Sequence, residues 1–176
     1  MTDSTRTYTL EIVKAGYTTL YREQTATNTA PLTTIALSPL INDPSIRVIL
    51  TWDDQPANLN AQFSTEIDGT TYTLDENNRG AVSTLPHLHM STIRSNNPAL
   101  TKQSSIETVT LHNPLPNISY HYRVEHIPTE NAENQQTTLS TSNARVEVYS
   151  SEGLLKTYKV PRTMLGHRWD VFDYKG

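Results

Sequence analysis

Short β-forming runs alternate with turn residues along most of the chain, and this alternation constrains the fold more than any other feature of the sequence. The strongest run is IRVILTW, Ile46–Trp52, in which every second residue from Ile46 onward is a large apolar side chain expected on one buried face. Asp68-Gly69 separates two further runs and favours a two-residue hairpin turn between them. The other runs with strand character are Gln62–Ile67, Thr70–Leu74, Ile106–His112, Ser119–Ile127, Ala144–Tyr149, Leu154–Val160 and Trp169–Tyr174.

These runs predict an all-β protein. No long segment repeats apolar residues with the 3.6-residue period of an amphipathic helix. About eight strands joined by short turns fall in residues 44–176, which predicts an antiparallel β-sandwich of the Ig-like or jelly-roll-like kind. Residues 1–43 are expected to form a separate N-terminal β-segment, and the proline-containing stretch Ser38–Ser45 marks the boundary.

The N-terminal segment is too short to build a domain by itself. It contains three strand-like runs, Tyr8–Ala15, Thr18–Thr25 and Leu32–Leu37. Three strands in about forty residues rarely enclose a self-sufficient core. We therefore expect these strands to need a packing partner, either the rest of the chain or another molecule.

Charge and composition exclude several classes of function. The net charge is −4, with both signs interspersed, so no basic stripe is available to nucleic acid. No apolar run approaches the length of a membrane span, and the first ten residues, MTDSTRTYTL, do not resemble a signal peptide. The chain has no cysteine, which excludes disulfides, thiolate zinc sites and cysteine nucleophiles.

Two acidic loops are candidates for calcium. Asp53 and Asp54 precede Asn58 and Asn60, and Asp75 opens a second loop, DENN. Clustered oxygen ligands in a loop suit Ca²⁺, but Asp and Asn also stabilise ordinary turns through their own backbone, and the full EF-hand spacing is absent. Calcium is therefore a candidate ligand, and the sequence indicates no other cofactor.

The histidines offer a weaker metal hypothesis, and no catalytic motif accompanies them. His87 and His89 would face the same way on a strand and would need a third ligand such as His112 or His121; two exposed histidines are the ordinary alternative. The sequence has no G-x-S-x-G, H-E-x-x-H or phosphate-binding glycine loop, so we expect no enzyme and assign no catalytic residue. The tryptophans, Trp52 and Trp169, are expected in the core rather than on a sugar-binding platform.

Two stretches resemble a known family. IRVILTWDDQPANLN at Ile46–Asn60, and ARVEVYSSEGLLKTYKVP at Ala144–Pro161 followed by GHRWDVFDYKG at Gly166–Gly176, resemble the YfaP-like β-sandwich domain of bacterial secreted proteins. In that family the domain often follows a carboxypeptidase-regulatory-like (transthyretin-like) β-domain, whose ending is similar to Gly16-Tyr17, Tyr21 and Thr34–Pro39 here. The resemblance implies that the N-terminal strands are the tail of a longer domain. Asn58-Leu59-Asn60 replaces the family's Asp-Leu-Asp, which weakens the case for calcium.

A partial domain leaves unpaired strand edges, which recruit partners. The segment could be cut from a larger protein, could pack onto its own sandwich, or could pair with a neighbouring subunit by β-augmentation. We interpret it as the third, and expect a non-catalytic, extracellular or cell-surface structural protein that self-assembles with copies of itself, plausibly as a filament. The alternative is a surface binding or adhesion module for carbohydrate or protein, with or without calcium. The residues expected at the assembly contact are Tyr8, Leu10, Ile12, Leu20, Tyr21, Ile35 and Leu37.

Overall fold

The protein is built almost entirely from antiparallel β-strands, in a computed structural model that describes residues 6–25, 35–53, 59–75, 77–78, 88–94, 105–127 and 139–176. For residues 88–94 and 105 it describes the backbone alone. These residues form eleven strands and one short 3-10 helix, η1 (Leu139–Thr141), and contain no helix long and apolar enough to cross a membrane. The expected all-β sandwich is confirmed.

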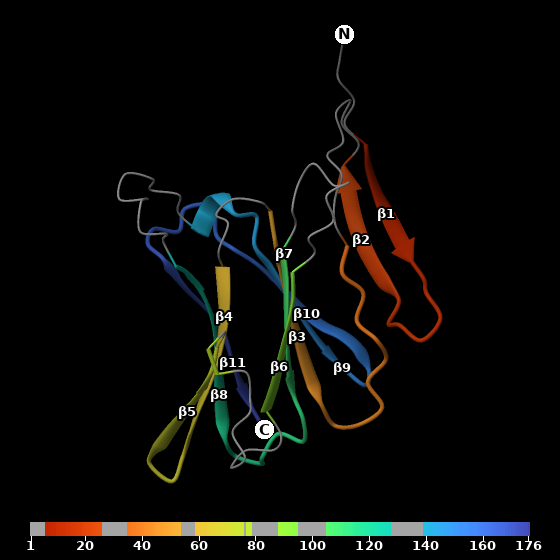
Figure 1. Cartoon of the computed structure of the whole chain (residues 1–176). Coiled ribbons are helices and arrows are strands. Elements are labelled where there is room, and N and C mark those ends of the chain that lie inside the picture. Colours follow the sequence, from red (N-terminus) through yellow and green to blue (C-terminus); the bar gives the residue numbers. More distant parts are fainter. Residues whose placement is uncertain are drawn as a thin grey trace.

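Nine of these strands form two sheets that pack face to face (Figure 1). Every paired strand in them is antiparallel. The five-stranded sheet has the order β10 (Gly153–Lys159), β9 (Arg145–Ser150), β3 (Ile46–Trp52), β7 (Ser105–Leu111) and β6 (Leu88–Arg94). The four-stranded sheet has the order β11 (Arg168–Lys175), β8 (Ser119–His126), β4 (Leu59–Ile67) and β5 (Thr70–Leu74).

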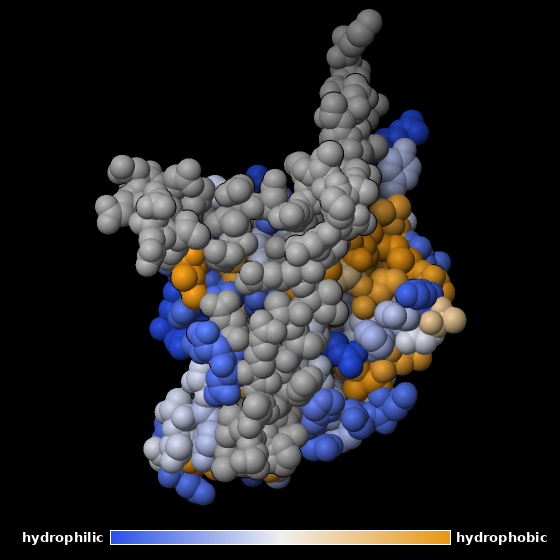
Figure 2. Space-filling view, viewed as in Figure 1, coloured by the Kyte–Doolittle hydropathy of each residue, from blue (hydrophilic) through white to orange (hydrophobic). Residues whose placement is uncertain are grey.

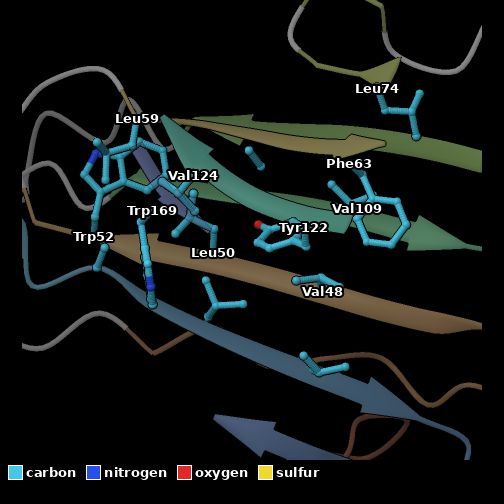
Figure 3. Packing of buried hydrophobic residues seen from close by; sticks show 14 of the residues in the cluster. Val48, Leu50, Trp52, Leu59, Phe63, Leu74, Val109, Tyr122, Val124 and Trp169 are labelled. Carbon is cyan, nitrogen blue, oxygen red and sulfur yellow. The ribbon is translucent and has the colours of Figure 1, made fainter. Parts of the chain in front are cut away.

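The core lies between the two sheets (Figure 3). The alternate residues of β3 from Ile46 to Trp52 all belong to it, as the sequence predicts, and Trp52 and Trp169 are only 3% and 6% exposed. The aromatic side chain of Phe63 on β4 packs between two residues of β8, with ring centroids 5.9 Å from Tyr120 and 5.8 Å from Tyr122. Both tryptophans are therefore core residues and cannot offer a flat surface to a sugar.

Local turn chemistry agrees with the predicted hairpin at Asp68-Gly69. Asp68 has a φ of 50° and Gly69 a φ of 74°, and positive values at both central residues define the turn type that Asp-Gly favours. The turn joins β4 to β5, which starts at Thr70 as predicted. β4 itself begins at Leu59 rather than Gln62, because its first residues pair with β8 from His126 onward.

β6 is the strand that the sequence pattern does not single out. Its residues, LHMSTIR, lack strict alternation, so no local signal marks them beyond the suggestion of a strand at His87–His89. Pairing with β7 along its whole length, from Leu88 opposite Leu111 to Arg94 opposite Ser105, defines the strand instead. His87 lies outside the described residues.

The N-terminal segment is a hairpin, β1 (Thr7–Ile12) and β2 (Leu20–Thr25), that forms a separate two-stranded sheet beside the sandwich (Figure 1). The predicted third strand is not found where it is described: Ile35–Leu37 has no strand, and one isolated bridge joins Tyr17 to Pro39. Two backbone bonds flank this bridge, from Thr18 N–H to Ser38 and from Leu40 N–H to Gly16, and the residues before it are held by the packing of Ala36 with Ile49 and Tyr149 rather than by a ladder. Residues 32–34 of that prediction lie outside the described residues.

Candidate functional site

The hairpin β1–β2 contains five of the seven residues predicted at an assembly contact. Its pairing runs without a shift from Thr7 opposite Thr25 to Ile12 opposite Leu20. Because side chains alternate between the faces of a strand, Tyr8, Leu10 and Ile12 share one face with Leu20, whereas Tyr21 lies on the other. On that other face the Tyr21 hydroxyl donates a 2.8 Å hydrogen bond to Glu11 across the pair, and this bond raises the pKa of Tyr21.

β2 attaches the hairpin to the sandwich. Leu20 is only 1% exposed, and Arg22, two residues further on the same face, donates a 3.2 Å hydrogen bond to Glu147 on β9. β1 is different, because its residues from Thr7 to Glu11 are all exposed. The hairpin thus has one strand fixed to the body and one strand directed to solvent.

Glu147 is the centre of this attachment. It lies on the outer face of the five-stranded sheet, opposite the core, and is 2% exposed. One carboxylate oxygen accepts from Arg22 and, at 2.6 Å, from Arg145; the other accepts from the Tyr149 hydroxyl at 2.9 Å. Burial, and then the charge of Glu147, raise the pKa of Tyr149 well above its usual value. The cluster is a buried carboxylate held by two guanidinium groups, with one of them supplied by the hairpin.

A second apolar cluster accompanies the ion cluster on this outer face. Ala36 and Ile41, from the segment after β2, pack with Ile49 of β3 and Tyr149 of β9. Backbone bonds tie this segment to the connection between β1 and β2, since Thr18 N–H donates to Ser38 and Leu40 N–H donates to Gly16. The N-terminal segment therefore covers the outer face of β3 and β9, which is the fold-back arrangement among the alternatives that the sequence leaves open.

The two remaining predicted contact residues, Ile35 and Leu37, are partly buried and lie in this covering segment rather than in a strand. Arg47 of β3 holds the segment by donating to the Ser38 hydroxyl at 3.1 Å and to the Pro39 carbonyl at 2.8 Å. In this conformation Ile35 and Leu37 belong to the attachment, whereas Tyr8, Leu10 and Tyr21 are 50%, 40% and 60% exposed.

Several edges of the sandwich carry features that discourage strand pairing. β10 has a register shift between Leu154 and Lys156, and it exposes Lys156 and Lys159. β11 has a register shift between Asp170 and Phe172 and exposes four charged residues, and β5 has only five residues. Bulges, charges and short length are the usual devices that keep sheet edges from pairing with other molecules. The charged residues of β11 are Arg168, Asp170, Asp173 and Lys175.

β1 lacks these features. Its six residues, TYTLEI, contain one charge and no proline or lysine, and its ladder has no shift. Half of the backbone N–H and C=O groups of a strand that pairs on one side point away from that partner. β5 is also regular and uncharged, but it is one residue shorter and its last three residues are partly or fully buried, whereas Thr7–Glu11 of β1 are all exposed. Figure 1 places β1 on the far side of β2 from both sheets.

Two of the predicted calcium ligands, Asp53 and Asp75, have other partners. Asp75 accepts hydrogen bonds from the backbone N–H groups of Asn77 and Asn78, both at 2.9 Å, which is ordinary turn chemistry. Asp53 accepts a 2.6 Å bond from the side-chain amide of Asn143. Asp54 lies outside the described residues. Those residues contain no group of three or more Asp, Glu, His or Cys side chains that could hold a metal ion.

His112 and His121, proposed as third ligands, are also separately engaged. The Nδ1 atom of His112 lies 2.9 Å from the Ser45 hydroxyl oxygen, and the Nδ1 atom of His121 lies 2.6 Å from a carboxylate oxygen of Asp173. Among the described residues, neither histidine belongs to a group of three or more side chains that could bind a metal ion.

The Arg22–Glu147 attachment is the feature that sequence reasoning misses. Glu147 stands in a strongly apolar strand, RVEVYS, and Ile49 and Tyr149 are apolar residues on the face opposite the core. Apolar residues on both faces of a strand indicate that both faces are covered, so this signal was available.

Comparisons of the chain with protein-family models, curated proteins and solved structures found no match, and the resemblance to the YfaP-like domain stays a prediction.

Proposed function

We propose that the chain is a non-catalytic structural protein that associates with copies of itself by pairing strand β1 with a strand of another copy. The observation that carries this proposal is the contrast between β1, a regular and exposed strand, and the bulged, charged or short edges of the sandwich. A regular apolar edge of this kind is a template for another strand. The extracellular or cell-surface location is part of the same proposal and rests on the family resemblance.

The attachment of β2 supports this role. A two-stranded hairpin alone is marginally stable in water, and Leu20 with the Arg22–Glu147 pair gives it a fixed position. A strand that is already ordered loses less conformational entropy when it pairs than a disordered segment does. The hairpin is thus prepared for pairing in the free protein.

Several exposed apolar side chains lie on or beside the hairpin. Tyr8 and Leu10 extend from one face of β1 and Tyr21 from the opposite face of β2, and Val13 follows at 68% exposed. In the space-filling view, the largest hydrophobic area lies on the flank that carries the hairpin (Figure 2). Burial of such side chains contributes about 25 cal/mol per Å² of apolar area removed from water.

The test compares wild type with Leu10→Lys by size-exclusion chromatography with light scattering over a range of protein concentrations. Wild type should shift to a larger mass as concentration rises, and Leu10→Lys should weaken this association on the order of tenfold, because a charge at a paired strand position opposes pairing. Leu155→Lys is the matched control, since Leu155 is also an exposed apolar residue, at 49%, but lies in the bulge of β10.

Association that responds to Leu155→Lys and not to Leu10→Lys would assign the contact to β10 and refute the proposal. A wild type that stays monomeric at every concentration would refute self-association altogether. Parallel runs with calcium and with a chelator test the calcium prediction, because calcium-dependent association should be lost in the chelator.

A further inference from the structure

The edge of β1 has a particular partner that its own sequence favours. Strand pairing between two copies needs an accessible edge on each, and the edges of β10, β11 and β5 are bulged, charged or short. The two-stranded hairpin has two edges, and β2 carries Arg22 and Glu23 and is attached to the sandwich through Leu20 and Arg22, which leaves β1 as the exposed regular edge among the strands with described side chains. We propose that β1 pairs antiparallel with β1 of a second copy across a two-fold axis, so that the two hairpins form one four-stranded sheet, β2–β1–β1–β2. This inference rests on the proposed function and specifies its partner.

The two-fold axis restricts the pairing register. An axis perpendicular to the sheet keeps the same face of both strands on the same side, so even-numbered residues must lie opposite even-numbered ones. A register offset by one residue would place Tyr8 and Leu10 of one copy opposite the polar face of the other. The permitted registers therefore centre on a single residue, which lies opposite itself in the second copy.

Among these registers, the one centred on Leu10 gives the most favourable cross-strand pairs. It places Leu10 opposite Leu10 of the second copy and Tyr8 opposite Ile12, so that apolar side chains meet at three positions. Glu11 lies opposite Thr9, and the two carboxylates are not opposite each other. The register centred on Thr9 has only two apolar pairs, and the one centred on Glu11 would oppose like charges.

The position of β1 leaves room for this contact. Thr7 to Glu11 are exposed, so no described part of the chain covers that strand, while the attachment through Leu20 and Arg22 lies on β2. In Figure 1 the two sheets of the sandwich lie on the β2 side of the hairpin. The second copy can therefore approach from the open side. Because the contact uses the same edge on both copies, it closes after two subunits and does not by itself propagate a filament.

A single introduced cysteine tests the register, because the chain contains no other thiol. Residues directly opposite in an antiparallel pair have Cα atoms about 4.5–5.5 Å apart, within the range that a disulfide spans. Under mild oxidation, Leu10→Cys should form a disulfide-linked dimer on the order of tenfold faster than Tyr21→Cys. Tyr21 is the control because it is more exposed than Leu10, 60% against 40%, but lies on β2, so two copies of it would be about 16 Å apart in the four-stranded sheet, three strand spacings across and two residues along.

The outcomes separate this inference from the proposed function. In one outcome, wild type self-associates, Leu10→Lys does not, and Leu10→Cys crosslinks no faster than Tyr21→Cys. This result would retain strand pairing through β1 but would overturn the two-fold register. Long regular assemblies of wild type by negative-stain microscopy, with no dominant dimer, would overturn the closed contact. A monomeric wild type would refute both.

Discussion

Replacement of Glu147 by glutamine should weaken the attachment of the hairpin to the sandwich while leaving the sandwich folded. Glu147 is 2% exposed and is the acceptor for Arg22 on the hairpin, and for Arg145 and Tyr149 on its own strand. Glutamine keeps the shape and one acceptor oxygen but removes the negative charge, so two guanidinium groups remain beside a neutral side chain. Removal of one member of a buried ion pair generally costs about 3–5 kcal/mol.

The share of this loss that concerns the hairpin is smaller. Arg145 and Tyr149 belong to β9 and do not separate from Glu147 when the hairpin opens, so of the bonds to Glu147 only the one from Arg22 is broken by opening. A buried hydrogen bond between charged groups contributes about 1.5–3 kcal/mol, and the Arg22 side chain is 10% exposed, so we expect a loss of about 2 kcal/mol. That corresponds to a roughly thirtyfold larger population of the open hairpin.

Amide hydrogen exchange measures this opening residue by residue. In Glu147→Gln, the amides of β2 that exchange through opening of the hairpin should exchange roughly thirtyfold faster, whereas the most protected amides of β4 and β8 exchange through global unfolding and report the larger loss of about 3–5 kcal/mol separately. Glu152→Gln is the control, because Glu152 is exposed and lies in the turn between β9 and β10. If β2 exchanges within about twofold of wild type in Glu147→Gln, the ion cluster does not hold the hairpin and the attachment depends on Leu20 and the apolar contacts alone.

Two further predictions concern the body of the sandwich. Burial, and then the charge of His167, lower the pKa of His126 below 6.5, so the unfolded chain binds a proton there more readily than the folded chain. The free energy of unfolding should therefore fall as the pH drops below 6.5 toward this lowered pKa. Denaturant titrations at several pH values should show that the stability of His126→Phe depends less steeply on pH than that of wild type. An equally steep pH dependence in His126→Phe would show that His126 is not the group responsible. Glu107, fully buried on β7, accepts a 2.6 Å hydrogen bond from the backbone N–H of Ala61 on the opposite sheet. Glu107→Leu leaves that N–H without its acceptor and should unfold about 2 kcal/mol more easily than Glu107→Gln, and equal denaturant midpoints would show that the bond contributes nothing.

Much of the sandwich could be predicted because its signals are local. Ile46–Trp52 alternates with the period of a strand, and its predicted bounds agree with those of β3. Asp68-Gly69 adopts the positive φ values that its turn requires. β6 could not be predicted in the same way, because its sequence has no clear period and its strand depends on pairing with β7.

The candidate site was predictable only in part. Tyr8, Leu10 and Tyr21 are exposed on the hairpin, and their role in assembly remains a prediction for the experiments above. Ile35 and Leu37 fall in a predicted third strand, but their segment joins the sandwich through side-chain contacts, from Ala36 and Ile41 in the apolar cluster and from Arg47, rather than through a ladder. A strand pattern identifies residues that alternate, but it does not identify a backbone partner.

The sequence by itself determined that the chain is an all-β sandwich, where most strands lie, and which face of β3 is buried, because alternation and turn chemistry act over a few neighbouring residues. Only the tertiary structure decided what covers the other face. Arg22 and Glu147 are 125 residues apart along the chain, and their 3.2 Å contact depends on how the hairpin folds back onto β9. Local periodicity carries no information about that separation, so the attachment of β2, and with it the exposure of β1, follows from the packing of the whole chain.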